Sequence, residues 1–195
     1  DSLGAQTTAS NNVALGYNAM AATTTGYTNV VIGSGAMDIA TTANNNIVIG
    51  YDAHQQATTG DGNIAIGKEA LQTLAGAYHN NVAIGFNAMK VTTGDTGNIA
   101  IGAYALDGYN SRSTTQCTAV GFQSMSGALA GYGNTAFGDN TMYVASSAFE
   151  NTCVGRSALV ALTTGDNNTA VGSYAGNTTT TGTGSTLIGY NCEAG

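Results

Sequence analysis

The sequence contains neither proline nor tryptophan, and only four of its 195 residues are basic: Lys68, Lys90, Arg112 and Arg156. Eleven acidic residues bring the net charge to -7. Nucleic acids and anionic membrane surfaces are bound by clustered lysine and arginine, so neither is an expected partner. The absence of proline favours uninterrupted β-ladders, because each proline removes one backbone hydrogen-bond donor.

Long hydrophobic runs are missing as well. No apolar segment approaches the roughly 20 residues that a bilayer-spanning helix needs, so we expect no membrane insertion. No signal peptide is visible, and a secretion signal or anchor would lie outside this chain. Helical periodicity of useful length is also absent, which argues against an α-helical fold.

A glycine repeat runs through the whole chain. Eleven glycines are separated by 17, 17, 17, 18, 17, 19, 17, 17, 17 and 17 residues. They are Gly16, Gly33, Gly50, Gly67, Gly85, Gly102, Gly121, Gly138, Gly155, Gly172 and Gly189. A unit this short cannot bury a core by itself and must stack on its neighbours. The sequence therefore predicts a single repeat domain over residues 1–195, an all-β parallel β-solenoid (β-roll) of about eleven 17-residue coils.

Each unit follows the pattern Asn-(Val/Ile/Thr)-Ala-(Ile/Val)-Gly-x-x-Ala-(Met/Leu), as in residues 81–89. Large apolar residues alternate with a small one before the glycine, which is the period of a β-strand with two unlike faces. We expect the two large columns, which begin at Val13 and Leu15, to point into the coil. The Met/Leu position is expected on a second, shorter strand that closes the coil over the first.

Asparagine occupies the fourth position before the glycine in nine of the eleven units. An asparagine repeated once per coil can pass side-chain hydrogen bonds from layer to layer, and so pair polar groups that a bend would leave buried. We therefore expect a structural ladder rather than a ligand site. Its members are Asn12, Asn29, Asn46, Asn63, Asn81, Asn98, Asn134, Asn151 and Asn168.

The three cysteines, Cys117, Cys153 and Cys192, lie in different columns and two units apart. Successive strand layers are about 4.8 Å apart, so two layers exceed the reach of a disulfide and none is expected within the chain. Free buried thiols are favoured over a bridge between chains. No CxxC or paired-histidine spacing indicates zinc, and we expect no metal and no cofactor.

Both ends of the chain fall within a coil. Asp1 to Leu3 match the phase of Asn18 to Met20, and the chain stops shortly after Cys192. Neither end carries the polar capping unit that solenoids generally need for solubility. We therefore expect a segment of a longer fibre, or one that stacks end to end on another piece.

Segments such as NNVALGYNAM from Asn11, GNIAIGKEAL from Gly62 and NNVAIGFNAM from Asn80 share an NxAIGxxA core, with Leu15 in place of the isoleucine in the first. In this core, all eleven units resemble the head repeats of trimeric autotransporter adhesins, the YadA-like left-handed β-roll, and similar repeats of phage tail fibres and related virion fibres. Each unit is longer here, because the Thr-Thr-Gly segment lengthens the coil. The resemblance implies a left-handed roll, a homotrimer of parallel chains around a common axis, and attachment to a surface.

No catalytic constellation is recognisable, so we expect no enzymatic activity. His54 and His79 fall in different columns, and the carboxylates show no paired spacing of the kind that a glycosidase uses. Aspartate follows Thr-Thr-Gly at Asp61, Asp95 and Asp166. There it fits turn chemistry, with calcium binding by stacked carboxylates as the alternative.

Aromatic residues gather in two columns. For the column directly after the glycine, stacking between layers is favoured over contact with a ligand. For the column at the end of the polar stretch, stacking and ligand contact are equally favoured. The first column holds Tyr17, Tyr51, Phe86, Phe122 and Tyr190, and the second holds Tyr27, Tyr78, Tyr132 and Phe149.

The period stretches at Ala77–His79 and at Asn110–Ser113, where we expect loops that bulge from one edge. Insertions on one edge of a solenoid often form its binding face. We therefore predict that a host surface glycan or protein contacts this edge. The predicted contacts are Tyr78, His79, Asn110, Arg112 and Tyr132.

Together these patterns favour a structural and adhesive fibre segment, a tail-fibre or surface-adhesin part that lies outside the cell on a virion or cell surface. One alternative is a single-chain solenoid that binds ice or another lattice, suggested by the many threonines. That function needs a flat exposed threonine array, but the column from Thr118 to Thr186 is expected to share its face with the buried aliphatic columns. A further alternative is the subunit of a self-stacking extracellular filament.

Overall fold

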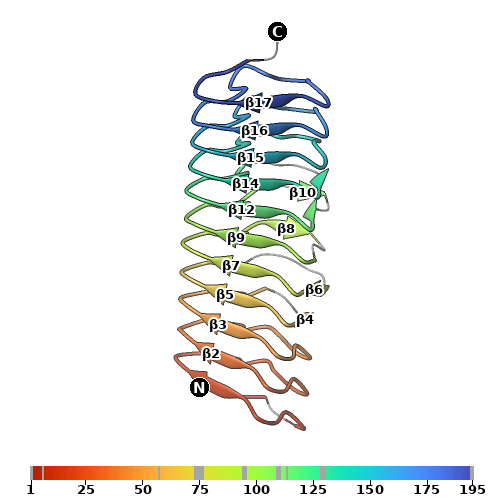
Figure 1. Ribbon diagram of the computed structural model, residues 1–195. Coiled ribbons are helices and arrows are strands. Elements are labelled where there is room, and N and C mark those ends of the chain that lie inside the picture. The colour runs from red at the N-terminus through yellow and green to blue at the C-terminus, as the bar shows by residue number, and fades with distance from the viewer. Residues whose placement is uncertain are drawn as a thin grey trace.

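The computed structural model describes residues 2–5, 7–56, 58–72, 77–93, 96–108, 111–112, 114–127 and 131–193, and shows a rod of stacked coils (Figure 1). Its main sheet is parallel and contains eleven strands, one from each glycine unit, in chain order. No helix occurs among the residues in these ranges. The prediction of an all-β parallel β-solenoid is confirmed.

The strands of the main sheet are three residues long and end directly before the repeated glycine. They are β1 (Val13–Leu15), β2 (Val30–Ile32), β3 (Ile47–Ile49), β5 (Ile64–Ile66), β7 (Val82–Ile84), β9 (Ile99–Ile101), β12 (Thr118–Val120), β14 (Thr135–Phe137), β15 (Thr152–Val154), β16 (Thr169–Val171) and β17 (Thr186–Ile188). Equivalent residues pair from strand to strand, as Ile49 does with Ile66. Each sequence column therefore forms a line along the rod.

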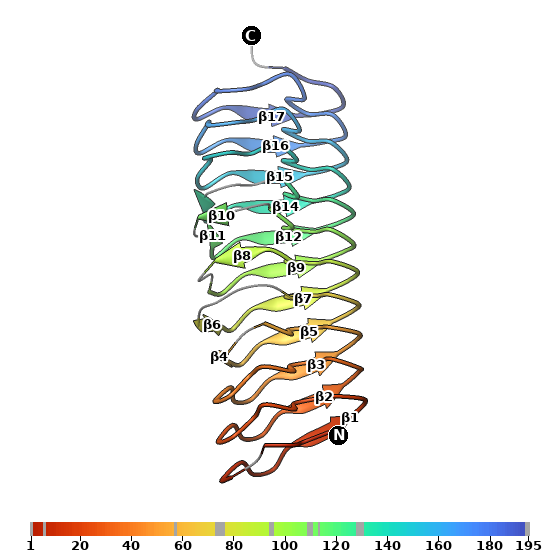
Figure 2. The same cartoon turned by 180° about the vertical axis from the view of Figure 1, so that it is seen from behind.

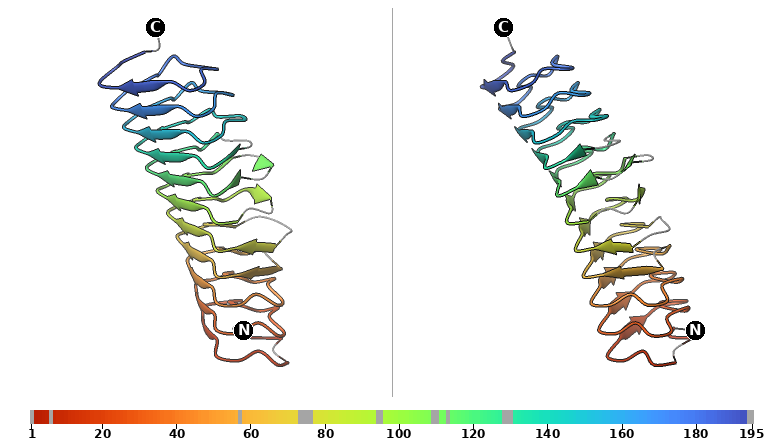
Figure 3. Two further views of the ribbon diagram at one scale, coloured as in Figure 1. Left: turned by 45° about the vertical axis from the view of Figure 1, so that its right-hand side comes forward. Right: turned by 90° about the vertical axis from the view of Figure 1, so that its right-hand side faces the viewer.

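Six further strands of two or three residues, the short strands, form three two-stranded parallel sheets on the other side of the rod (Figures 2 and 3). The pairs are β4 (Thr59–Asp61) with β6 (Ala77–His79), β8 (Thr92–Thr93) with β10 (Ser111–Arg112), and β11 (Thr114–Thr115) with β13 (Gly131–Tyr132). These strands lie in the polar stretches that precede β5, β7, β9, β12 and β14. The expectation of a second strand at the Met/Leu position is wrong, because those residues lie in turns.

The expectation of loops at the two insertions is also wrong for the residues that the structure describes there. Thr59 pairs with Ala77, 18 residues later, and Thr92 pairs with Ser111, 19 residues later. The extra residues therefore precede these strands rather than interrupt them. Because backbone pairing is kept, Ala77–His79 and Ser111–Arg112 are strands.

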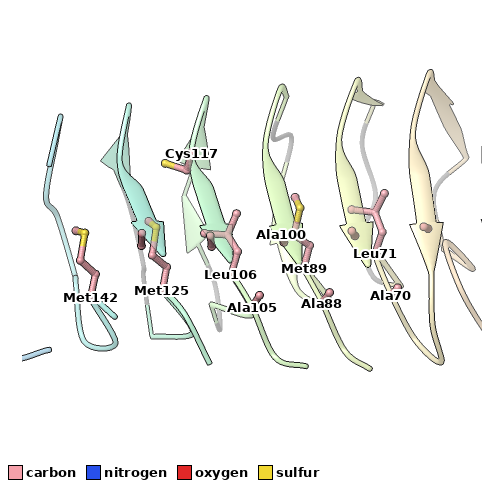
Figure 4. Packing of buried hydrophobic residues seen from close by; sticks show 14 of the residues in the cluster. Ala70, Leu71, Ala88, Met89, Ala100, Ala105, Leu106, Cys117, Met125 and Met142 are labelled. Atoms are coloured by element: carbon pink, nitrogen blue, oxygen red, sulfur yellow. The ribbon is translucent and has the colours of Figure 1, made fainter. Parts of the chain in front are cut away.

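The interior of the coil is filled by small residues and by the Met/Leu column. The middle residue of a main strand, such as Ala100, is buried together with the alanine and the Met or Leu that follow the glycine, such as Ala88 and Met89 (Figure 4). The expectation that the large apolar columns point inward is wrong: Val13 and Leu15 are exposed, and so are most of their equivalents. The narrow coil has no room for two aliphatic columns besides these residues, so the alternating strand turns them outward.

The repeated glycine makes the corner after each main strand. Gly50 has a φ of 144°, and a Cβ there would lie 2.3 Å from the carbonyl oxygen of Gly67 in the next coil. Both the backbone angle and the close approach of the next layer exclude a side chain. Two further left-handed residues complete the turn, for example Asn87 and Met89 with φ values of 55° and 48°.

The asparagine column forms a hydrogen-bonded ladder inside the coil. The Oδ1 of Asn46 accepts the main-chain N–H of Asn63 at 2.8 Å and its Nδ2 at 3.1 Å. The Nδ2 of Asn46 in turn donates to Asn29 Oδ1 and to the carbonyl oxygen of Gly60, at 3.0 and 2.8 Å. Each side chain therefore joins three layers and pairs polar groups that water cannot reach.

Candidate functional site

The outward face of the main sheet is a continuous apolar surface. We use this name for the first and third residues of all eleven strands, none of which is charged. More than a third of the surface of many of these side chains is exposed, including Val13, Leu15, Val30, Ile47, Ile49, Ile99, Ile101, Phe137, Val154, Val171 and Ile188. Soluble monomers rarely leave so extended an apolar surface in water, so this face is suited to cover another apolar surface.

The first residue of each main strand is valine or isoleucine up to β9 and threonine from β12 onward. Ile99 pairs with Thr118, and threonine then continues to the last strand. No hydrogen bond of the five hydroxyl groups is found within the described part of the chain, whereas Thr23 and Thr24 in the polar stretch donate to carbonyl oxygens of the next coil. The five residues are Thr118, Thr135, Thr152, Thr169 and Thr186. Thr152 and Thr186 are exposed and the other three are partly exposed, so the expectation that this column shares a buried face is wrong.

The short strands bring most of the predicted receptor contacts to one side of the rod. Tyr78 and His79 lie in β6, Arg112 lies in β10 and Tyr132 lies in β13, while Asn110 is outside the described residues. His79 and Tyr132 both stand six residues before their glycine and are three units apart, roughly 14 Å at the usual strand spacing. Tyr132 is 48% exposed. This side can therefore offer a ring and an imidazole to an extended ligand.

His79 is linked to the aspartate of the preceding unit. The main-chain N–H of Asp61 donates to His79 Nδ1 at 3.3 Å. Asp61 Oδ2 lies 3.9 Å from the same nitrogen.

The aspartates of the Gly-Asp turns accept hydrogen bonds from the preceding layer. Asp61 Oδ1 accepts both the main-chain N–H and the Nδ2 of Asn44, at 2.9 and 3.0 Å. Asp166 Oδ1 accepts the N–H of Phe149 at 2.9 Å, and Asp95 is outside the described residues. Asp61 is the last residue of β4, and these hydrogen bonds join neighbouring coils rather than residues of one turn. Among the residues that the structure describes, no group of three or more His, Cys, Asp or Glu could hold a metal ion.

The ring of Tyr132 also contacts its neighbour in the same column. Its centroid is 4.9 Å from that of Phe149, with the planes tilted by 40°. Stacking therefore uses part of the ring, and the exposed remainder is free to contact a ligand.

The aromatic column after the glycine is engaged in contacts between layers. Phe86 and Tyr104 meet edge to face at 5.2 Å, and Tyr104 meets Phe122 in the same way at 6.2 Å. Lys68 Nζ lies 5.8 Å from the ring centroid of Tyr51 and 5.6 Å from that of Phe86. These pairs stabilise the corner that follows the main strand.

A small charge cluster lies beside this column. Glu69 forms ion pairs with Lys90 and, at 3.2 Å, with Lys68. The hydrogen bond from Lys90 is the main reason that the pKa of Glu69 is lowered. Burial raises the pKa of Asp107 to about 6, although the charge of Lys90 opposes this change. The cluster joins neighbouring coils and shows no arrangement for catalysis.

Sequence reasoning missed a buried histidine. His54 stands four residues after Gly50, where other units have Met or Leu, and this position was the signal that it belongs to the core. The side chain is completely buried and neither ring nitrogen makes a hydrogen bond of normal geometry. Burial lowers the pKa of His54 to about 4, while the nearby main chain of Leu71 weakly favours protonation.

The fold and these surfaces define the chain as a parallel β-solenoid with an apolar outward face. No pocket is present on the described part of the chain. Comparison with protein-family models, with curated proteins and with solved structures finds no match. None of the described residues forms a helix that could cross a membrane.

Proposed function

We propose that this chain is a non-enzymatic structural segment of an adhesive fibre, a tail-fibre or surface-adhesin part that works outside the cell on a virion or cell surface. Copies of the rod associate through the outward face. The observation that carries the proposal is the uncharged, largely apolar outward face, which is at least partly exposed along all eleven strands of the main sheet.

The energetics favour association along the full length of the rod. Complete burial of one Val, Leu or Ile side chain is worth about 1.5–3 kcal/mol. Bringing two proteins together costs about 4–15 kcal/mol in lost motional freedom. A contact over two or three layers would barely offset this cost, since these side chains are already partly buried in the single chain. Contact over most of the eleven layers would exceed it.

The form of the assembly is part of the same proposal. The resemblance to adhesin head repeats supports a left-handed coil and three parallel chains whose outward faces meet at a common axis. The side of the rod that carries the short strands would then point away from the axis (Figure 3). His79 and Tyr132 would stay accessible there for a surface glycan or protein.

The mass of the purified chain in solution, measured by light scattering, tests the assembly. We expect three times the mass of one chain. A double variant, Ile49→Glu with Ile101→Glu, should be monomeric because it places charge on the outward face. Thr42→Glu with Thr164→Glu, at exposed positions away from this face, is the matched control and should remain trimeric. A monomeric wild-type chain at every concentration would contradict the proposal.

The adhesive part needs a separate test. Fluorescently labelled rods are applied to a printed panel of defined surface glycans and glycoproteins, and we expect retention on at least one of them. Tyr132→Ala with His79→Ala should abolish that retention, whereas Tyr17→Ala, an exposed ring in the other aromatic column, should not. Retention that is unchanged in the double variant would show that recognition does not use this side.

Binding to an ordered lattice such as ice is a second candidate. It is favoured by one observation: the column from Thr118 to Thr186 is accessible on a regular parallel sheet, with one threonine per layer. Thermal hysteresis of the purified protein tests it. A measurable freezing-point gap that disappears in Thr152→Tyr would favour this candidate over the fibre, and its absence in a monomeric sample would exclude it.

A further inference from the structure

The outward face presents nearly the same pair of side chains in every layer. Two rods that meet through such faces can slide by one coil and lose only one layer of contact in eleven. Apolar contact alone therefore hardly distinguishes one alignment from the next. A defined assembly of repeats needs a feature that breaks the repeat and penalises the wrong alignments.

The outward face contains one such feature. Its first column is valine or isoleucine from β1 to β9 and threonine from β12 to β17. We call Thr118, Thr135, Thr152, Thr169 and Thr186 the threonine block. Their hydroxyl groups make no hydrogen bond within the described part of the chain, so at present only water can pair them. Covering the face with another surface removes that water.

We propose that the threonine block fixes the polarity and the axial alignment in which copies of this chain associate. The inference rests on the proposed association through the outward face. In a parallel, unshifted assembly each threonine lies level with the same threonine of its neighbour. A hydroxyl both donates and accepts, so such neighbours can pair with each other.

Other alignments leave hydroxyl groups unpaired. A shift by one coil places one threonine against valine or isoleucine at each contact, and every further coil adds another. In an antiparallel arrangement β12 to β17 face β7 to β1, so all five threonines meet aliphatic side chains. Burying a hydroxyl group without a partner is unfavourable, so these alignments are disfavoured in proportion to the number of mismatches.

The properties of the face favour another copy of the chain as its partner. A partner that covers the whole face must itself be apolar, uncharged and built with the same rise per layer, which a second copy satisfies. Phe137 is a second feature that breaks the repeat, because it is the one aromatic residue of the outward face. The smaller Thr135 lies on the same face of β14. In the unshifted assembly the bulky rings of all copies share one level.

Distances between spin labels on associated chains test the alignment. Cys192→Ser removes the most accessible thiol, since Cys117 and Cys153 are buried. A label is then placed either at Thr25→Cys or at Thr164→Cys, both exposed and far apart along the rod. In the parallel unshifted assembly each site gives one narrow distance between copies, and the two sites give similar distances.

A threonine-block variant carries valine at all five positions, which keeps the shape and the β-branching. We expect it to associate but to lose its alignment, so that the narrow distance broadens toward longer values in steps set by the layer spacing of about 4.8 Å. The matched control carries valine at Thr8, Thr42, Thr58, Thr178 and Thr181, which are exposed and outside the outward face, and should keep the narrow distance.

The outcomes separate the two proposals. A narrow distance that persists in the threonine-block variant overturns the alignment role and leaves association intact. A long distance at both sites in the wild-type chain would indicate antiparallel packing, and this result also overturns the alignment role of the threonine block. A chain that shows no distance because it is monomeric contradicts the proposed assembly itself.

Discussion

Val48 and Ile49 are neighbours in β3 and face opposite sides of the coil: Val48 is completely buried, whereas 36% of Ile49 is exposed. The larger side chain is the one that faces water. This relationship recurs along the rod and is the basis for assigning the outward face as a contact surface. It also means that the stability of one coil and the association of several chains depend on different residues.

The first prediction separates these two sets of residues. Ala100→Leu should destabilise the single chain by about 1–3 kcal/mol, because the buried position has no space for a larger side chain. Ile101→Ala should cost about 1 kcal/mol or less, since Ile101 faces outward. Both are measured by urea unfolding in an Ile49→Glu background, in which light scattering first verifies that the chain is monomeric. A larger loss for Ile101→Ala would show that the faces are assigned the wrong way round.

The second prediction concerns the glycine corner. Gly85 has a φ of 137°, and a Cβ there would lie 2.5 Å from the carbonyl oxygen of Gly102. Gly189 has a similar φ of 130°, but a Cβ there meets nothing within 4 Å. Gly189→Ala should therefore cost only the backbone strain, about 1–3 kcal/mol. Gly85→Ala should cost roughly 1–3 kcal/mol more for the clash. Equal melting temperatures for the two variants would contradict the close approach between coils.

The third prediction tests the asparagine ladder. Asn46→Leu removes the acceptor for Asn63 and the donor to Gly60, and we expect a loss of roughly 1–3 kcal/mol for each polar group left unpaired. The reverse change is available in the same column, where Cys117 stands in place of asparagine and its Sγ lies 3.8 Å from the carbonyl oxygen of Gly131. Cys117→Asn should raise the melting temperature. An unchanged or lower value would mean that the ladder adds nothing at that layer.

The repeat made the architecture predictable from the sequence, but not the direction of the side chains. The glycine spacing requires stacked coils, and the position of Asn46 before its strand indicates a ladder. Alternation along a three-residue strand is compatible with either face being inside. The choice depends on the volume of the whole coil, which Met89 and Ala100 already fill. The sequence predicted loops at the two insertions near the receptor contacts, whereas Tyr78, His79 and Arg112 lie in strands that form only by pairing with a neighbouring coil.

The fourth prediction concerns pH and His54. Its pKa falls from 6.5 to about 4 on burial, so below pH 6.5 the unfolded chain binds a proton that the folded chain does not. Stability should decrease as the pH falls from 6.5 to 4, by about 3 kcal/mol in total. Asp107 acts in the opposite direction. Its pKa is raised by burial to about 6, so the folded chain binds that proton first as the pH falls through 6.

A variant comparison isolates the histidine from Asp107. The difference in free energy of unfolding between His54→Met and the wild-type chain should change by about 3 kcal/mol in favour of the variant as the pH falls from 7 to 4. Met37→Leu, a neutral change in the same buried column, should follow the pH dependence of the wild-type chain. Parallel curves for His54→Met and the wild-type chain would show that His54 is protonated in the folded state or is accessible to water.

A cryo-EM structure of the purified assembly tests the central claim most directly, because it shows what covers the outward face. We expect the main sheets of parallel chains to meet along a common axis, with Ile49 in the contact, Thr152 level with Thr152, and the strand pair β4 and β6 turned toward solvent. Density that shows the outward face in water, or the short strands in the contact between chains, would contradict the account.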